Sequence, residues 1–287
     1  ILGMAVAAAG APDAGQAIAA GTKHVTERQF LKYNRSHEEA ADQAALYYLD
    51  HTKLSPKGLL ELLTVLNRQE KTLYGDLNPY VLTHPLSRER IANVENHLKT
   101  SPNKKATLSP ELQTQYDRTQ AKLHAFLEKP EVTFEKYPES STTIPAIYAR
   151  SIAYFRSPNM KKAIEQIDLL LKKHPSDPYF NELKGQILYE NGKVSEAVPF
   201  YQIASNQLPD SPLMKIQLGI TQIGSGEEDL RKQAIINLEQ ALRAEPKNSF
   251  AWRQLAIAYG RGGDYGHSNL ALAEEALLLE RYSDLKN

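Results

Sequence analysis

Three stretches of sequence decide the fold. Residues 163–175 read AIEQIDLLLKKHP, residues 197–209 read AVPFYQIASNQLP, and residues 234–246 read AIINLEQALRAEP. Each stretch opens with alanine and ends with proline, and successive copies begin 34 and 37 residues apart. Tyr201 and Leu238 are large apolar residues in the same register. Residue types that share one spacing in this way indicate an array of structural repeats.

The repeat resembles the tetratricopeptide repeat, a helix-turn-helix unit of about 34 residues in which a small residue lets two helices approach closely. The additional residues of the longer spacing fall in GSGEED at residues 224–229, where a loop insertion costs little. A last repeat is indicated by residues at first-helix positions, namely Trp252, Leu255, Ala256 and Tyr259. Asn181 and Lys184 depart from the pattern, because these positions are usually apolar, and Ser268 replaces the last small residue. The sequence predicts three to four repeats.

The N-terminal half is predicted to be helical as well. Apolar residues at helical spacing and two Ser-Pro helix starts predict helices over residues 35–50, 56–70, 87–98 and 111–129. The segment from Lys71 to Pro85 is rich in turn formers and is predicted to be a loop. EVTFEKY at residues 131–137 favours a short extended piece. We therefore predict an all-α chain, with the first domain at residues 1–129, a proline-rich linker at 130–145 and the repeats at 146–287.

Composition excludes several classes of function. The chain has 34 Lys and Arg against 34 Asp and Glu, so no bulk charge favours nucleic acid, and we predict no nucleic-acid partner. The absence of cysteine excludes thiolate metal ligands, cysteine nucleophiles and disulfides. Residues 1–11, ILGMAVAAAGA, resemble the apolar part of a secretory signal without its basic segment. We expect a buried or interfacial alanine-rich helix there, in a chain that begins part-way into a longer product.

Residues 36–42 read SHEEAAD and contain the first half of the zinc-protease motif H-E-x-x-H. The second histidine of that motif is replaced by Ala41, and one imidazole cannot form a catalytic zinc site. In the frame that starts at Glu38 the residues read E-x-x-A-D, which puts Glu38 and Asp42 one helical turn apart. This spacing suits a metal-binding carboxylate with a supporting acid. Acids at i and i+4 also occur on ordinary solvated helix faces.

This frame resembles the third-ligand helix of the gluzincin zinc peptidases of the HtpX, CAAX prenyl protease and BepA type. THPLSRERI at residues 83–91 is similar to the T-H-P segment and following helix start of the bacterial BepA-like members. The resemblance implies that Glu38 binds zinc, that Asp42 and Arg35 support it, and that His84 can take the fourth zinc position and block the nucleophilic water. Arg35 and Arg90 could anchor the two helices electrostatically, but we expect an ordinary surface salt bridge for each of them.

No H-E-x-x-H occurs in the 287 residues, so the general base of the peptidase family is absent from them. We expect this chain to be inactive alone, with the missing half upstream or on a separate polypeptide. One hypothesis is a zinc endopeptidase whose repeats recruit substrates. Another is a noncatalytic adaptor or chaperone with a relict metal site. A third, a repeat scaffold unrelated to peptidases, requires both motifs to be coincidences.

The repeats are predicted to bind protein substrates or partners in the groove that first helices line. The register places ten residues there: Tyr148, Ile152, Phe155, Tyr179, Gln186, Tyr189, Ile216, Ile220, Phe250 and Ile257. The same residues are equally compatible with the repeat core or with cover by the N-terminal domain. The resemblance to BepA-like proteins implies a bacterial periplasmic location, a role in quality control around the outer-membrane assembly machinery, and peripheral association with the membrane.

Overall fold

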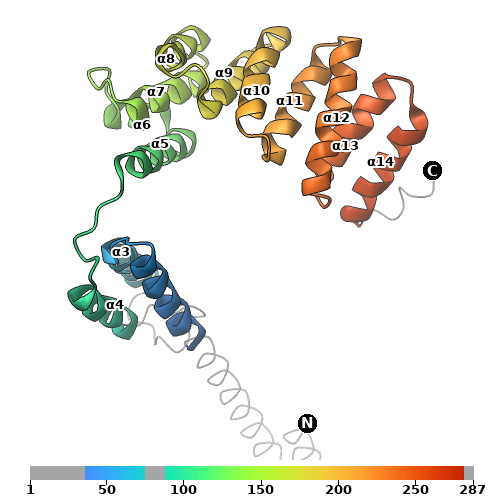
Figure 1. Ribbon diagram of the computed structural model, residues 1–287. Coiled ribbons are helices and arrows are strands. Elements are labelled where there is room, and N and C mark those ends of the chain that lie inside the picture. Colours follow the sequence, from blue (N-terminus) through green and yellow to red (C-terminus); the bar gives the residue numbers. More distant parts are fainter. Residues whose placement is uncertain (1–35, 75–87, 281–287) are drawn as a thin grey trace, which may run out of the picture. The chain divides into compact units, whose positions relative to one another are not determined.

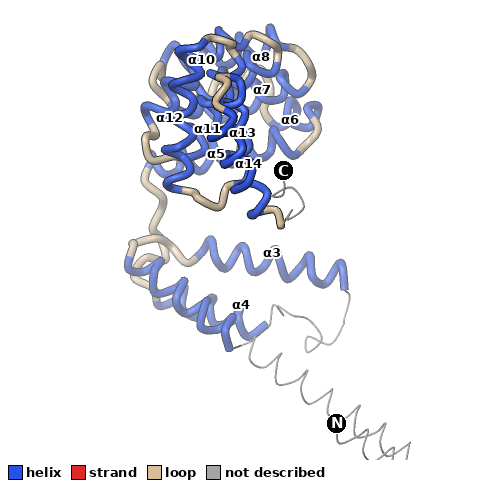
Figure 2. Tube along the Cα trace, turned by 90° about the vertical axis from the view of Figure 1, so that its right-hand side faces the viewer, coloured by secondary structure: helices blue, strands red, loops and turns tan. Residues whose placement is uncertain are grey.

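The computed structural model describes residues 36–74 and 88–280, and every regular element in these ranges is an α-helix (Figure 2). A first helix covers residues 36–51. The others are α3 (Lys57–Tyr74), α4 (Arg88–Thr100), α5 (Pro110–Leu127), α6 (Pro130–Lys136), α7 (Ile144–Arg156), α8 (Met160–Lys173), α9 (Pro178–Glu190), α10 (Val194–Gln207), α11 (Pro212–Gly224), α12 (Glu228–Ala244), α13 (Ser249–Arg261) and α14 (Tyr265–Leu278). The all-α prediction is confirmed for the described residues.

The chain divides into two compact units, Ile1–Glu111 and Leu112–Asn287. In the first unit, helix 36–51, α3 and α4 pack around Leu46, Leu63 and Val94, which are 6%, 4% and 0% exposed. Each helix thus supplies one fully buried aliphatic side chain. Because this core is small, polar contacts between the helices contribute a larger share of the packing than they do in a large domain.

The second unit contains four helix pairs in chain order, α7 with α8, α9 with α10, α11 with α12, and α13 with α14 (Figure 1). The alanines that define the repeat, Ala163, Ala197 and Ala234, are all 0% exposed. Each of these alanines lies in the second helix of its pair, at a position where a larger side chain would hold the two helices apart. The predicted repeat array is confirmed, with four pairs in the described part of the chain.

Glycine allows the closest approach between paired helices. A Cβ atom built on Gly185 of α9 would lie 2.8 Å from Cδ2 of Tyr201 in α10. In the next pair, a Cβ on Gly219 would lie 2.9 Å from Cγ of Leu238. Because the two glycines are 34 residues apart, the repeat period fixes the site of contact as well as the helix boundaries.

Capping residues start the first helix of each later repeat. The side chain of Asp177 accepts hydrogen bonds from the backbone N–H groups of Tyr179 and Phe180. Ser211 and Asn248 accept from the third residue of α11 and α13 in the same way. These caps follow the spacing of 34 and 37 residues. They satisfy N–H groups that have no partner within the helix.

Helices α5 and α6 belong to the second unit, so the observed division differs from a first domain that ends at residue 129. Ala121 and Ala125 of α5 are 0% exposed and share a core with α7, α8 and α9. The stretch 131–137 is not extended, because Pro130 is the first residue of α6 and its fixed φ favours a helix start. Thr133 is the buried residue of this short helix and is 0% exposed. The prediction of an extended segment at residues 131–137 was therefore wrong.

Helices with the length and apolar character to cross a bilayer do not occur among the described residues. The expected alanine-rich helix at residues 1–11 lies outside the described residues.

Candidate functional site

Glu38 and Asp42 project from helix 36–51 toward one guanidinium, that of Arg90 in α4. Arg90 donates from Nε to Oδ2 of Asp42 at 2.6 Å and from Nη2 to Oδ1 at 2.8 Å. Its Nη1 lies 2.9 Å from Oε2 of Glu38. One helical turn between the two acids therefore places both carboxylates within reach of a single arginine.

This ion-pair cluster is buried between the two helices. Asp42 is 8% exposed and Arg90 is 9% exposed, so the expectation of an ordinary surface role for Arg90 was wrong. Hydrogen bonding to Asp42 raises the pKa of the Arg90 guanidinium above its ordinary value. Two parallel N–H···O bonds fix the plane of the Asp42 carboxylate and hold Arg90 where it also contacts Glu38.

The cluster fits one supported metal ligand but not a complete metal site. Zinc accepts carboxylate oxygen as a ligand, and a fixed second acid is typical of its surroundings. The described residues contain no group of three or more His, Cys, Asp or Glu side chains that could hold a metal ion. His84 and Arg35, the other residues expected at the site, lie outside the described ranges.

A second polar cluster in the first unit surrounds Asp50. Its Oδ2 lies 2.7 Å from Nε2 of His97, and its Oδ1 accepts a 2.5 Å hydrogen bond from Ser101. The bond from Ser101 holds the pKa of Asp50 below its ordinary value. The serine hydroxyl bonds the acid and not the imidazole, so the arrangement does not activate a nucleophile. It ties the end of helix 36–51 to the end of α4.

The second unit offers a different kind of site, because α5 lies against the first helices of the repeats. Arg118 of α5 bonds Asp177 at the start of α9 at 2.8 Å, and its guanidinium lies 4.2 Å from the ring centroid of Phe180. Lys122 bonds Glu182 of α9 at 2.8 Å. Arg156 of α7 donates to the carbonyl of Ala125 at 2.8 Å. These contacts hold the middle and the C-terminal half of α5 against the array.

The ten predicted groove residues differ in exposure. Tyr148, Ile152 and Ile216 are buried at 1%, 0% and 3% exposure. Two are exposed, Tyr179 at 45% and Phe250 at 53%. The other five are half-buried: Phe155, Gln186, Tyr189, Ile220 and Ile257. In the first repeat, Tyr148 and Ile152 share a core with Ala121 and Ala125 of α5.

A cavity of about 580 Å³ lies between α5 and the start of α9. Arg118, Leu123 and Phe126 line it from α5, and Pro178 and Tyr179 line it from α9. Its size is within the range of small-molecule and peptide pockets. Its lining contains both apolar surface and ion-paired groups, and it opens beside the predicted groove residue Tyr179. Sequence reasoning missed the part of this site that α5 contributes.

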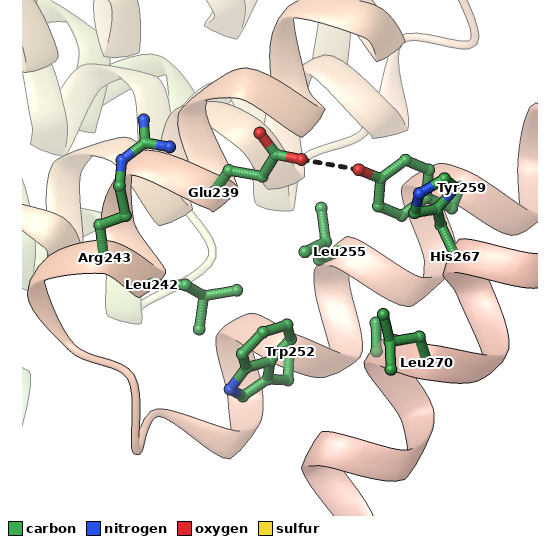
Figure 3. A pocket seen from close by; sticks show the side chains of 9 residues that line it. Glu239, Leu242, Arg243, Trp252, Leu255, Tyr259, His267 and Leu270 are labelled. Carbon is green, nitrogen blue, oxygen red and sulfur yellow. Dashed lines mark hydrogen bonds between the residues drawn. The ribbon is translucent and has the colours of Figure 1, made fainter.

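Figure 3 shows a smaller cavity of about 320 Å³ in the last two repeats. Trp252, Leu255 and Leu242 form its apolar wall, and Tyr259 donates a 2.6 Å hydrogen bond to Oε1 of Glu239 at one edge. Burial, together with that bond, raises the pKa of Tyr259 to about 12. Tyr259 and Glu239 thus satisfy each other at this edge, and Arg243 and His267 also line the cavity.

Two parts of the chain match models of known protein families. Residues 1–98 match the family described as Peptidase family M48. Residues 152–273 match the family described as Psidin, N-terminal TPR repeats region. A comparison of the whole chain with curated proteins finds no match.

Solved structures resemble the repeat part. MamA AMB-1 is 19% identical with a TM-score of 0.50, over 57% of this chain and 98% of that one. YrrB, described as a TPR protein with an unusual peptide-binding site, is 15% identical with a TM-score of 0.50, over 59% of this chain and 88% of that one. MamA from Desulfovibrio magneticus RS-1 is 18% identical with a TM-score of 0.49, over 60% and 97%. At these identities the likeness shows the fold alone. Residues 1–98 are therefore similar to peptidase family M48, and the helix pairs that follow have the fold of tetratricopeptide repeats.

Proposed function

We propose that this chain is part of a zinc-dependent endopeptidase of bacterial protein quality control, in which the repeats recruit protein substrates or partners. The observation that carries the proposal is the Glu38–Asp42–Arg90 cluster inside a segment that matches a peptidase family. In this proposal Glu38 is a zinc ligand, and Asp42 and Arg90 hold its helix. His84 is the candidate residue that blocks the metal at rest.

Bound zinc would supply Lewis-acid chemistry and a more acidic water. In this proposal Asp42 and Arg90 orient one zinc ligand, Glu38, and the repeats bind the protein substrate. H-E-x-x-H does not occur in the 287 residues, so the activity that we propose takes its histidine pair and general base from residues outside them. A periplasmic location near the outer-membrane assembly machinery, with peripheral membrane contact, remains part of the proposal through the resemblance to BepA-like proteins.

A noncatalytic adaptor or chaperone is the second candidate. It is favoured by the observation that both acids of E-x-x-A-D bond Arg90 and that the described residues contain no metal-binding group of three. In this alternative the cluster only joins helix 36–51 to α4. The repeats then perform the whole function by binding protein.

Metal content and proteolysis distinguish the two candidates. The protein is expressed from its complete reading frame, zinc is measured by mass spectrometry, and cleavage of β-casein is followed. Glu38→Gln is expected to lower zinc content and to reduce cleavage at least 100-fold. Glu39→Gln, which changes an exposed neighbour, is the matched control and is expected to leave both unchanged.

Equal zinc content and cleavage in wild type and Glu38→Gln would reject Glu38 as a ligand. A wild-type protein that contains no zinc and cleaves nothing would support the adaptor. Circular dichroism of each variant shows whether the fold has survived the loss of one bond to Arg90.

A further inference from the structure

Helix α5 shows what the first helices of the repeats can bind. Its buried face presents Ala121 and Ala125, both 0% exposed, to the core formed with α7 and α9. Its two cations, Arg118 and Lys122, pair with acids of α9. The chain therefore holds an amphipathic helix of its own on the face that covers Tyr148 of the first repeat. Small and apolar residues make the contact, and flanking charges fix the position.

The acids that hold α5 occur in one repeat only. Asp177 and Glu182 of α9 correspond, 34 residues later, to Ser211 and Ile216 of α11. After a further 37 residues the corresponding residues are Asn248 and Arg253 of α13. The cations of α5, Arg118 and Lys122, would therefore have no acidic partner at these positions of the later repeats and would meet a cation in the last one. This difference confines α5 to the start of the array.

Within the second unit, no other described helix covers the same face of α11 and α13. Leu213 and Phe250, which correspond to Tyr179 in the register, are 57% and 53% exposed. Ile220 and Ile257 lie half-buried two turns further along their helices. An exposed apolar row of this kind, in the direct continuation of a face that already holds a helix, is typical of a groove that binds a further helix.

The positive charge of Arg253 favours a bound helix that carries acidic residues. The Arg253 side chain is 45% exposed and bonds Glu275 through Nε at 2.7 Å. A guanidinium has five N–H donors in a fixed fork, so it can hold Glu275 and a second carboxylate together. An acidic residue beside the apolar stripe of a bound helix would meet Arg253, whereas a basic residue there would be repelled.

We propose that the face of α11 and α13 formed by Leu213, Ile220, Phe250, Arg253 and Ile257 binds an amphipathic helix of a protein partner whose apolar stripe is flanked by acidic residues. This inference rests on the recruiting role of the repeats in the proposed function. It adds the chemistry of the partner and limits the binding face to the last two repeats, since α5 fills the first.

Two fluorescein-labelled peptides test the proposal by fluorescence anisotropy against the whole chain. One has the α5 sequence PELQTQYDRTQAKLHAFL. The other is identical except for Arg118→Glu and Lys122→Glu. We expect the acidic peptide to bind at least tenfold more tightly, because each charge-assisted hydrogen bond contributes about tenfold or more to affinity.

Variants of the protein locate the binding. Arg253→Gln and Phe250→Ala are each expected to weaken the acidic peptide about tenfold. Tyr265→Ala removes a side chain that is 69% exposed on α14, a helix that contributes no residue to this face, and serves as the matched control with unchanged affinity. Phe250→Ala leaves every ion pair in place, so it tests the face independently of any effect of Arg253→Gln on Glu275.

Three results would overturn the proposal: equal affinity for the two peptides, no saturable binding of the acidic peptide, or binding that neither variant weakens. Tighter binding of the unchanged peptide would show that it displaces α5 from the first repeats instead. The assay contains no zinc and follows no cleavage. A negative result therefore rejects this partner chemistry, and the peptidase assignment is decided by the metal and cleavage measurements.

Discussion

Among single residues, Arg90 joins helix 36–51 to α4 through two acids. Sequence spacing alone placed Glu38 and Asp42 on one helix face, since a helix turn fixes their relation. It could not identify Arg90 as their common partner, because that contact joins residues 48 positions apart. The packing of Leu46 and Val94 brings the two helices together and thereby decides which arginine reaches the acids.

Replacing Arg90 by glutamine is expected to loosen the first unit. The change leaves two acids without the guanidinium, and the loss of one partner from a buried ion pair costs about 3 kcal/mol or more. Hydrogen exchange followed by mass spectrometry should show faster exchange of the helix 36–51 amides. Arg88→Gln alters an exposed arginine two residues earlier and should change stability by less than about 0.5 kcal/mol. Equal exchange in the two variants would contradict a structural role for Arg90.

Among the elements, α5 shows the limit of reasoning from sequence. The repeat helices were predictable because alanine, proline and capping positions recur at one period. The boundary of α5 was also close to its predicted range. Its packing partner was not predictable, because Ala121 and Ala125 give α5 only a narrow apolar face. Tyr148 and Ile152 are buried because α5 packs against them. The sequence register predicted that both residues line the groove, but it could not show that α5 covers them.

The docking of α5 is expected to depend on the charge of Asp177. Asp177→Asn removes the ion pair with Arg118 and keeps a side chain that caps α9 well. The loss of one charge-assisted hydrogen bond should cost about 1.5 kcal/mol, the lower end of the usual range, because the pair is partly exposed. Amides of α5 should then exchange about tenfold faster.

Ser211→Asn is the matched control, because residue 211 is the same helix cap one repeat later, where no α5 cation bonds it. It should leave α5 exchange unchanged. If Asp177→Asn has no effect on α5, then the apolar core alone holds this helix.

At the scale of the whole molecule, the second unit is a one-dimensional array. Each helix of α7 to α14 packs mainly against its neighbours in chain order, and contacts between more distant helices are few. In such an array stability is approximately a sum of repeat and nearest-neighbour terms. The only tryptophan of the chain, Trp252, lies in the last repeat. Its fluorescence therefore reports on one end of the array.

Gly185→Ala is expected to separate the unfolding of the two ends. The new methyl would lie 2.8 Å from the Tyr201 ring, and such overpacking costs about 1–3 kcal/mol. In urea, circular dichroism should begin to fall before Trp252 fluorescence changes. Gly266→Ala adds a methyl whose nearest neighbour is 3.8 Å away, so both signals should stay close to those of the wild type. Coincident transitions in Gly185→Ala would indicate that the array unfolds as one cooperative block.

The short connection between the two units sets a tether length. Ser55 donates to the carbonyl of Lys104, and the backbone N–H of Ala106 bonds the carbonyl of Asn103, so the chain is fastened to the first unit almost to α5. Residues 107–109 connect this point to α5, and three residues span at most about 10 Å. Because the repeats and the first unit belong to one chain, a polypeptide bound by the repeats in the proposed function would meet the first unit intramolecularly, at an effective concentration that depends on this connection. Even weak and short-lived capture by the repeats would therefore raise the local supply of polypeptide at the first unit.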